Sequence, residues 1–272
     1  MRGLDSCDTA DTQPPKRHDG TASFWEHLDV MRWMILRCII VVAVLAVAMF
    51  MVRDELFSII LAPSHHGFIT FRLLGTPDFQ LHLMNTMLTE QFYVHVKMAV
   101  YAALLTASPY LLCEIFMFLL PAMYADERRY AFPAVIGAYS MFALGTLVNY
   151  FLVFPCTLHF LGTYQVSPDI HNMLTLQSYM DTLLMMSLVF GIIFEIPVIS
   201  WLLARFGLLR AEWMTQYRRH AIVAILVLAA VITPTADAFT LLIVSLPIWM
   251  LYEVSVVVVR RVGNRQKAIG KS

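Results

Sequence analysis

The sequence predicts an all-α integral membrane protein with six transmembrane helices. Of its 272 residues, 59% are hydrophobic and only 14% are charged, whereas soluble domains average about 25% charged residues. The hydrophobic residues form runs far longer than the strand of a membrane barrel needs, which indicates helices. The net charge is zero, so the composition indicates no nucleic-acid partner.

The N-terminal region is first polar and then amphipathic. Residues 1–23 lack the apolar stretch of a cleavable signal peptide, so we expect them to form a disordered cytoplasmic tail. The segment FWEHLDVMR at 24–32 places apolar side chains on one helical face and Glu26 and Asp29 on another. This pattern predicts a short helix at the membrane interface that leads into the first span.

Six apolar runs follow, separated by polar or proline-containing connections. Prolines in or beside these runs predict kinked helices that form a concave bundle, and Pro155 is expected to close the third span. The sixth run starts near Phe239 and contains Pro247. The first five predicted spans cover residues 33–52, 94–120, 131–154, 182–203 and 221–233.

The last two spans are predicted to be short. The run 221–233 is too short to cross about 30 Å of hydrocarbon as a full helix. The sixth span is expected to bury less of the bilayer than the second, third and fourth spans, because Pro247 should bend it.

Basic residues are distributed unevenly among the connections. If the N-terminus is cytoplasmic, 16 of the 19 Lys and Arg residues lie on the cytoplasmic side, and only Arg53, Arg72 and Lys97 lie outside. Because basic residues accumulate in cytoplasmic loops, both termini are predicted to be cytoplasmic. The six-span membrane domain then covers residues 24–261, followed by a second cytoplasmic tail at 262–272.

The connection LLPAMYADERRY at 119–130 carries the first candidate binding residues. Asp126 and Glu127 lie there beside Arg128 and Arg129, on the same predicted side as Glu26 and Asp29. A carboxylate at a membrane surface is a docking point for a cationic ligand, because a guanidinium binds it in a charge-assisted pair. The alternative is that Glu127 pairs with its own neighbouring arginines.

Glu195 is the second candidate, because it lies deep in the fourth span within FGIIFEIPV. An ionisable residue at this depth is costly and marks a functional site by default, although a neutral, hydrogen-bonded Glu195 is the alternative. Such a residue also suits an ion-coupled small-solute transporter, but the chain halves show no internal repeat. Asp237, in the turn after the fifth span, is expected to cap the last helix rather than to contact substrate.

Enzymatic and metal-dependent functions have no support in the sequence. There is no HExxH or GxSxG motif, and the C-terminal GKS lacks the glycine spacing of a phosphate-binding loop. The four cysteines form neither a zinc pattern nor a disulfide framework. We therefore expect neither a cofactor nor a metal, and no catalytic residues.

Four segments, in this order and with six spans, resemble the TatC family, the core membrane component of the twin-arginine protein translocase. They are FWEHLDVMR, PAMYADERR, FGIIFEIPV and ITPTAD, and the resemblance covers about residues 24–261. Glu90, Phe92 and Lys97 also match the family's ExFxxxxK entry to the second span. Asp237, Glu90 and Lys97 are therefore candidates for structural or gating roles.

The resemblance implies export of folded proteins across the cytoplasmic (inner) membrane, driven by the proton-motive force. The cargo would carry a twin-arginine signal peptide that contacts Glu127. Glu195 would face the docking region for single-span TatA/TatB-type subunits, within a receptor complex that contains several copies of this chain. The glutamate of the family's HLxELR pattern is replaced by Val30, so Asp126, Glu26 and Asp29 are the other acidic candidates for the signal-peptide site.

Overall fold

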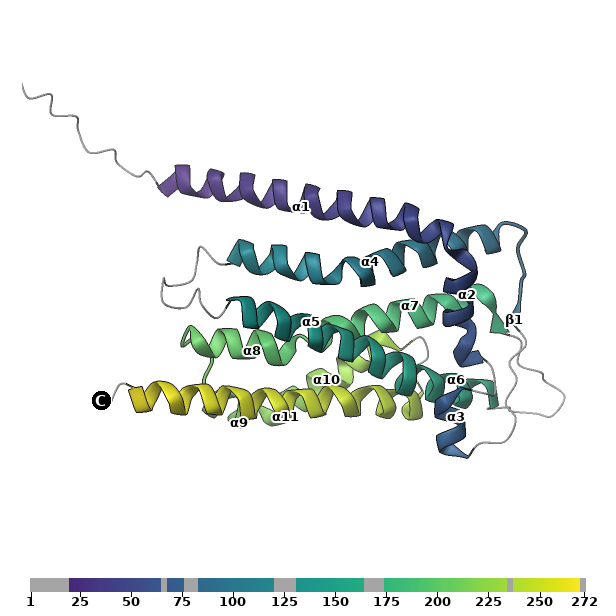
Figure 1. Cartoon of the computed structure of the whole chain (residues 1–272). Helices are drawn as coiled ribbons and strands as arrows, with labels where there is room; N and C mark the ends of the chain where they lie inside the picture. The colour runs from purple at the N-terminus through teal and green to yellow at the C-terminus, as the bar shows by residue number, and fades with distance from the viewer. Residues whose placement is uncertain are drawn as a thin grey trace, which may run out of the picture.

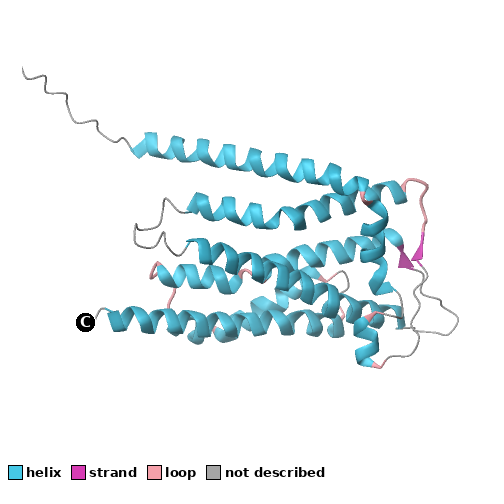
Figure 2. Ribbon diagram, in the orientation of Figure 1, coloured by secondary structure: helices cyan, strands magenta, loops and turns pink. Residues whose placement is uncertain are grey.

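The computed structural model shows a bundle of helices and describes residues 20–64, 68–75, 83–119, 131–163, 174–233 and 237–269. Apart from two short strands, the regular structure in these ranges is helical (Figure 2). The beginning of α1 (Gly20–Met51) and the end of α11 (Ala238–Ile269) lie at one end of the bundle (Figure 1). We call this the terminal end, and the opposite one the far end.

Five helical segments among the described residues are long and apolar enough to cross a membrane. These segments match five of the six predicted spans and extend most of them by several residues. They cover Leu28–Met51, Glu90–Phe118, Phe132–Thr163, Leu176–Arg205 and Ala238–Asn264.

The first helix, α1, is continuous over 32 residues. No proline or glycine interrupts residues 21–51, so the expected interfacial helix and the first span form one rod rather than two helices. The helix packs mainly against α4 (Glu90–Leu119). Apolar side chains such as Val44 and Val47 remain exposed on α1, which suits a helix that faces lipid.

Short elements close the far end. Helix α2 (Arg53–Leu61) runs across the ends of the longer helices (Figure 1), and the Tyr179 hydroxyl donates to the Ile60 carbonyl oxygen at 2.8 Å. Strand β1 (Leu83–Met84) pairs in parallel with β2 (Leu174–Thr175). These contacts tie the first half of the chain to the second half.

The third span continues past Pro155, so the prediction that this proline closes it is wrong. Helix α5 (Ala131–Val148) passes through a π-helical turn into α6 (Phe154–Thr163). Proline has no N–H to donate to the carbonyl four residues earlier, which is that of Phe151. The hydroxyl of Thr70, in α3 (Ile69–Leu74), donates to this carbonyl oxygen instead. A side chain from another segment thus supplies the bond that Pro155 cannot make.

The fourth span is broken in the middle. Helix α7 (Leu176–Ile193) and helix α8 (Ile196–Arg205) are separated by a turn at Phe194 and Glu195. Pro197 lies in the first turn of α8, where its missing N–H costs no intrahelical bond. The break therefore falls at the ionisable residue of this span.

Glycines let α5 and α7 approach closely. A Cβ atom added at Gly145 would lie 2.6 Å from the Phe190 carbonyl oxygen and 2.7 Å from the Phe194 ring. A Cβ atom added at Gly191 would lie 2.7 Å from the Phe142 ring. Each helix thus packs a phenylalanine over a glycine of the other, as small residues permit between membrane helices, and this contact positions the residue that precedes Glu195.

The C-terminal region contains α9 (Ala211–Gln216), α10 (Arg218–Ile232) and α11. Helix α10 has 15 residues and reaches about 22 Å at about 1.5 Å per residue, less than a hydrocarbon core of about 30 Å. The expected shortness of the last span is wrong for α11, which has 32 residues and contains Pro247. Pro247 removes only one helical hydrogen bond, so it does not end the helix. Apolar residues continue the helix on both sides of Pro247, and polar residues extend it beyond Arg261.

Candidate functional site

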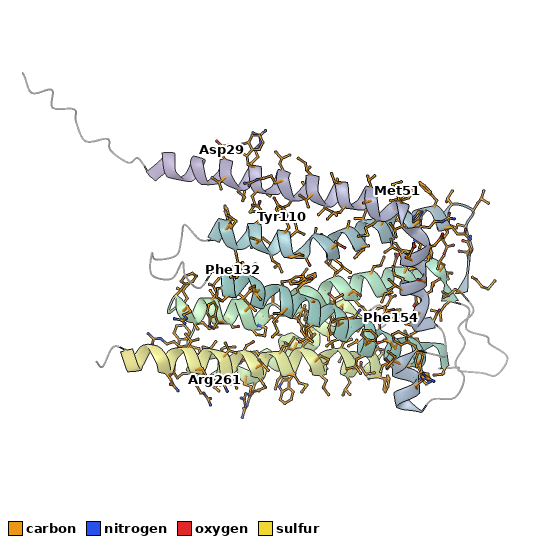
Figure 3. The ribbon with its side chains drawn as sticks, in the orientation of Figure 1. Asp29, Met51, Tyr110, Phe132, Phe154 and Arg261 are labelled. Atoms are coloured by element: carbon orange, nitrogen blue, oxygen red, sulfur yellow. The ribbon has the colours of Figure 1, made fainter. Side chains whose placement is uncertain are left out.

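Of the four acidic candidates for the signal-peptide site, only Asp29 has a side chain within the described part of the chain. Glu127 and Asp126 lie in residues 120–130, outside the described residues. The flanking helices are described: α4 ends and α5 begins at the terminal end, where α1 also begins (Figure 1). Asp29 is exposed on α1 at this end (Figure 3), whereas the side chain of Glu26 is outside the described part of the chain.

A guanidinium–carboxylate pair joins α1 to α4 near this end, and the sequence analysis did not identify it. Arg37 lies 3.3 Å from the Glu114 carboxylate, which also accepts a hydrogen bond from the Tyr110 hydroxyl at 2.7 Å. Glu114 is buried and Arg37 is half-exposed. The sequence does place one basic and one acidic residue inside two apolar runs. Because charged groups in membrane helices are expected to pair, this pattern could have predicted the contact.

Glu195 is buried at the break between α7 and α8, with 8% of its surface exposed. Its Oε1 atom has no hydrogen-bond partner among the described residues. Two turns earlier on α7, by contrast, the Ser187 hydroxyl accepts a hydrogen bond from the Asn149 amide at 2.9 Å. A buried polar atom without a hydrogen-bond partner is costly, so this atom is poorly satisfied within the described part of the chain.

The Glu90 carboxylate at the far end accepts several hydrogen bonds and links two helices. It accepts hydrogen bonds from three backbone N–H groups, those of Thr86 at 2.8 Å, Met87 at 3.1 Å and Gln177 at 2.9 Å. The Thr86 hydroxyl donates as well, at 3.2 Å. Glu90 is almost fully buried. It therefore joins the start of α4 to the start of α7, and the sequence could not show the bond to Gln177.

Lys97 and Asp237 are also held by neighbours. The Lys97 ammonium lies 2.6 Å from Asp181 on α7 and 4.7 Å from the centre of the Tyr93 ring. The Asp237 carboxylate accepts a hydrogen bond from the Thr240 N–H at 2.7 Å, the geometry of a helix N-cap. These contacts place Glu90, Lys97 and Asp237 in the framework of the bundle.

The described residues offer no cluster that could hold a metal. No three His, Cys, Asp or Glu side chains gather among them. Three of the four cysteines, Cys38, Cys113 and Cys156, are described, and all three are free thiols.

Comparisons with known proteins agree over most of the chain. Residues 26–247 match the family model described as Sec-independent protein translocase protein (TatC). The chain is 32% identical over 240 residues to the Sec-independent protein translocase protein TatC of Deinococcus radiodurans, covering 88% of this chain and 86% of that protein. It is 33% identical over 236 residues to the protein of the same name from Koribacter versatilis, covering 86% and 83%.

The fold is also similar to a solved structure. The crystal structure described as the twin arginine translocase receptor TatC has a TM-score of 0.72 and 27% sequence identity, and the similarity covers 87% of this chain and 99% of that chain. A second crystal structure of that receptor, in the detergent DDM, has a TM-score of 0.73 at 26% identity. The chain therefore belongs to the TatC family of Sec-independent protein translocase proteins, which are membrane components of a translocase and not catalytic enzymes.

Proposed function

We propose that this translocase subunit recognises twin-arginine signal peptides and exports folded proteins across the cytoplasmic membrane with the proton-motive force. The observation that supports the proposal is the position of Asp29 and of the two helix ends that flank the predicted binding loop. Asp29 lies at the end where α4 and α5, the helices that flank Asp126 and Glu127, also end and begin. If Asp126 and Glu127 lie near Asp29, their carboxylates would match a pair of guanidinium groups.

The topology in this proposal has six spans, with both termini in the cytoplasm. The bias of Lys and Arg residues supports this orientation, and the common position of the beginning of α1 and the end of α11 supports an even number of crossings (Figure 1). The sixth crossing is assigned to α10, whose 15 residues are mostly apolar. The terminal end is then the cytoplasmic end.

Affinity for the signal peptide must come from two sources. Glu127 and Asp126, assisted by Asp29 and Glu26, would bind the arginine pair and orient it. Exposed ion pairs contribute only about 0.2–1 kcal/mol each. The apolar segment of the signal peptide must therefore supply much of the binding free energy by entering the bilayer beside the bundle.

Glu195 would serve assembly with partner subunits. Its buried carboxylate has an oxygen atom without a partner among the described residues, and a polar side chain on a single-span helix of the TatA/TatB type could donate to it. Such interhelical hydrogen bonds contribute about 1–2 kcal/mol or less in membranes. Several copies of this chain with their partners would form the receptor complex.

The test is crosslinking of a photoreactive twin-arginine signal peptide to the protein in inverted membrane vesicles. Glu127→Gln should reduce crosslinking up to about fivefold, the loss that corresponds to about 1 kcal/mol for one exposed ion pair, while membrane insertion is unchanged. The matched control is Glu55→Gln, which removes an exposed carboxylate at the far end and should leave crosslinking intact. Unchanged crosslinking of Glu127→Gln would contradict the proposal.

A further inference from the structure

Two cavities lined by arginines lie beside the end of α11, the larger between α8, α9 and α11 and the smaller between α8 and α11. The larger has a volume of about 730 Å³, and its lining includes Arg210, Glu212 and Arg260. The smaller has a volume of about 380 Å³ and is lined in part by Arg205 and Arg261. Asn264 contributes to both. Figure 3 places Arg261 near the C-terminal end of α11, at the terminal end of the bundle.

The backbone around the larger cavity is fixed by specific contacts. Gly207 has a φ of 71° and ends α8, a left-handed conformation that favours glycine, and the Leu208 N–H bonds to the Leu203 carbonyl at 3.0 Å. The Tyr252 hydroxyl on α11 donates to the Met214 carbonyl of α9 at 2.6 Å. The cavity is therefore a preformed feature of three packed helices.

Positive charge exceeds negative charge around both cavities. Four arginines face one acidic lining residue, Glu212. The nearby Glu253 is already paired with Arg218 at 2.8 Å. None of the ion pairs found among the described residues involves Arg210, Arg260 or Arg261. These guanidinium groups therefore keep their donors available for an anion.

Aromatic rings orient two of the arginines. The Arg210 guanidinium lies 5.7 Å from the centre of the Trp213 ring, and the Arg205 guanidinium lies 5.5 Å from that of Trp201. A guanidinium that stacks on a ring is held in place and still presents N–H groups at its edge. Planar donors of this kind match the oxygen atoms of a phosphate group.

The surface next to the larger cavity is apolar. Trp213, which lines this cavity, is 49% exposed, and Leu208 is 63% exposed. Beside the smaller cavity, Val258 of α11 also lines an apolar cavity with Val254, which is exposed. Tryptophan beside arginine is typical of the headgroup level of a membrane. The apolar side chains of α11 offer a path for acyl chains.

We propose that the arginine-lined cavities bind the phosphate group of an anionic phospholipid, with its acyl chains along α11. Basic pockets between membrane helices are suited to acidic headgroups. The adjoining apolar surface favours a lipid over free phosphate, which needs no such surface. The lining residues include none of the proposed signal-peptide residues, so this inference does not depend on their role.

The test is native mass spectrometry of the delipidated protein titrated with phosphatidylglycerol or phosphatidylcholine. The wild type should retain phosphatidylglycerol in preference to phosphatidylcholine. Arg210→Gln and Arg260→Gln should each weaken phosphatidylglycerol binding about fivefold, as expected for loss of one arginine near an anionic headgroup. The matched control is Arg219→Gln, because Arg219 is exposed and lines neither cavity.

Three outcomes would overturn the proposal. Equal affinity for the two lipids would remove the role of headgroup charge. An equal loss of phosphatidylglycerol binding in Arg219→Gln would show that general positive charge, and not a specific site, attracts the lipid. Displacement of phosphatidylglycerol by a comparable concentration of inorganic phosphate would assign the cavities to a soluble anion. Gel filtration of each variant establishes that it is folded, so that a loss of binding reports on the site.

Discussion

The Glu90 carboxylate at the far end and the Glu195 carboxylate at the helix break have opposite surroundings. Glu90 accepts hydrogen bonds from three backbone N–H groups and one hydroxyl. Glu195 is similarly buried but has an oxygen atom without a described partner. The difference shows that burial alone does not define the role of a carboxylate: Glu90 is satisfied by neighbouring donors, whereas Glu195 has an oxygen atom that no described donor satisfies.

Replacing Glu90 should cause the largest loss of stability. Glu90→Ala leaves buried N–H groups of Thr86, Met87 and Gln177 without an acceptor, at about 1–3 kcal/mol for each that stays unsatisfied. After relaxation we expect a loss of about 2–4 kcal/mol in the free energy of unfolding, measured by circular dichroism in detergent. Glu90→Gln keeps one acceptor oxygen and should lose less. Equal stability of Glu90→Ala and the wild type would remove Glu90 from the framework.

Replacing Glu195 should not lower the free energy of unfolding, in contrast to replacing Glu90. Glu195→Leu removes a buried polar group that lacks a described partner, so the protein should be stabilised by about 1 kcal/mol or remain unchanged. Export of a twin-arginine cargo and co-purification of single-span subunits should both fall. A variant less stable than the wild type would show that Glu195 has an internal partner, and the comparison with Glu90 would then fail.

The Lys97–Asp181 pair should give the smallest effect. The side chains are 26% and 42% exposed, so solvent screens their attraction. A double-mutant cycle with Lys97→Met and Asp181→Asn should give a coupling energy of about 0.2–1 kcal/mol, measured as unfolding free energies. A coupling energy well above this range would show that the Lys97–Asp181 pair contributes to stability as a buried network does.

The sequence predicted the helical spans well where periodicity and length decide them. Five long segments coincide with predicted spans, because an apolar run of about 20 residues has few alternatives. Proline positions were less informative. Pro155 and Pro247 lie within helical segments, because Thr70 or neighbouring turns compensate for the missing N–H.

The sequence predicted individual candidate residues of the site but not the contacts between them. The sequence indicated Glu90, Lys97, Glu195 and Asp237, but it could not indicate their contacts. Glu90 and Gln177 are 87 positions apart, and Arg37 and Glu114 are 77 positions apart. Such pairings depend on which helices become neighbours, and local patterns do not encode this. The roles of Glu127, Asp126, Glu26 and Asp29 remain predictions that the crosslinking experiment tests.

The length of α10 has a consequence for the surrounding lipid. If α10 crosses the membrane, its 15 residues leave about 8 Å of hydrocarbon unmatched. Lipids beside α10 must then thin locally, at a fraction of a kcal/mol per Å. The dielectric barrier to a polar chain decreases as the hydrocarbon layer narrows. The hydrocarbon layer that a polar chain would have to cross is therefore thinnest beside α10.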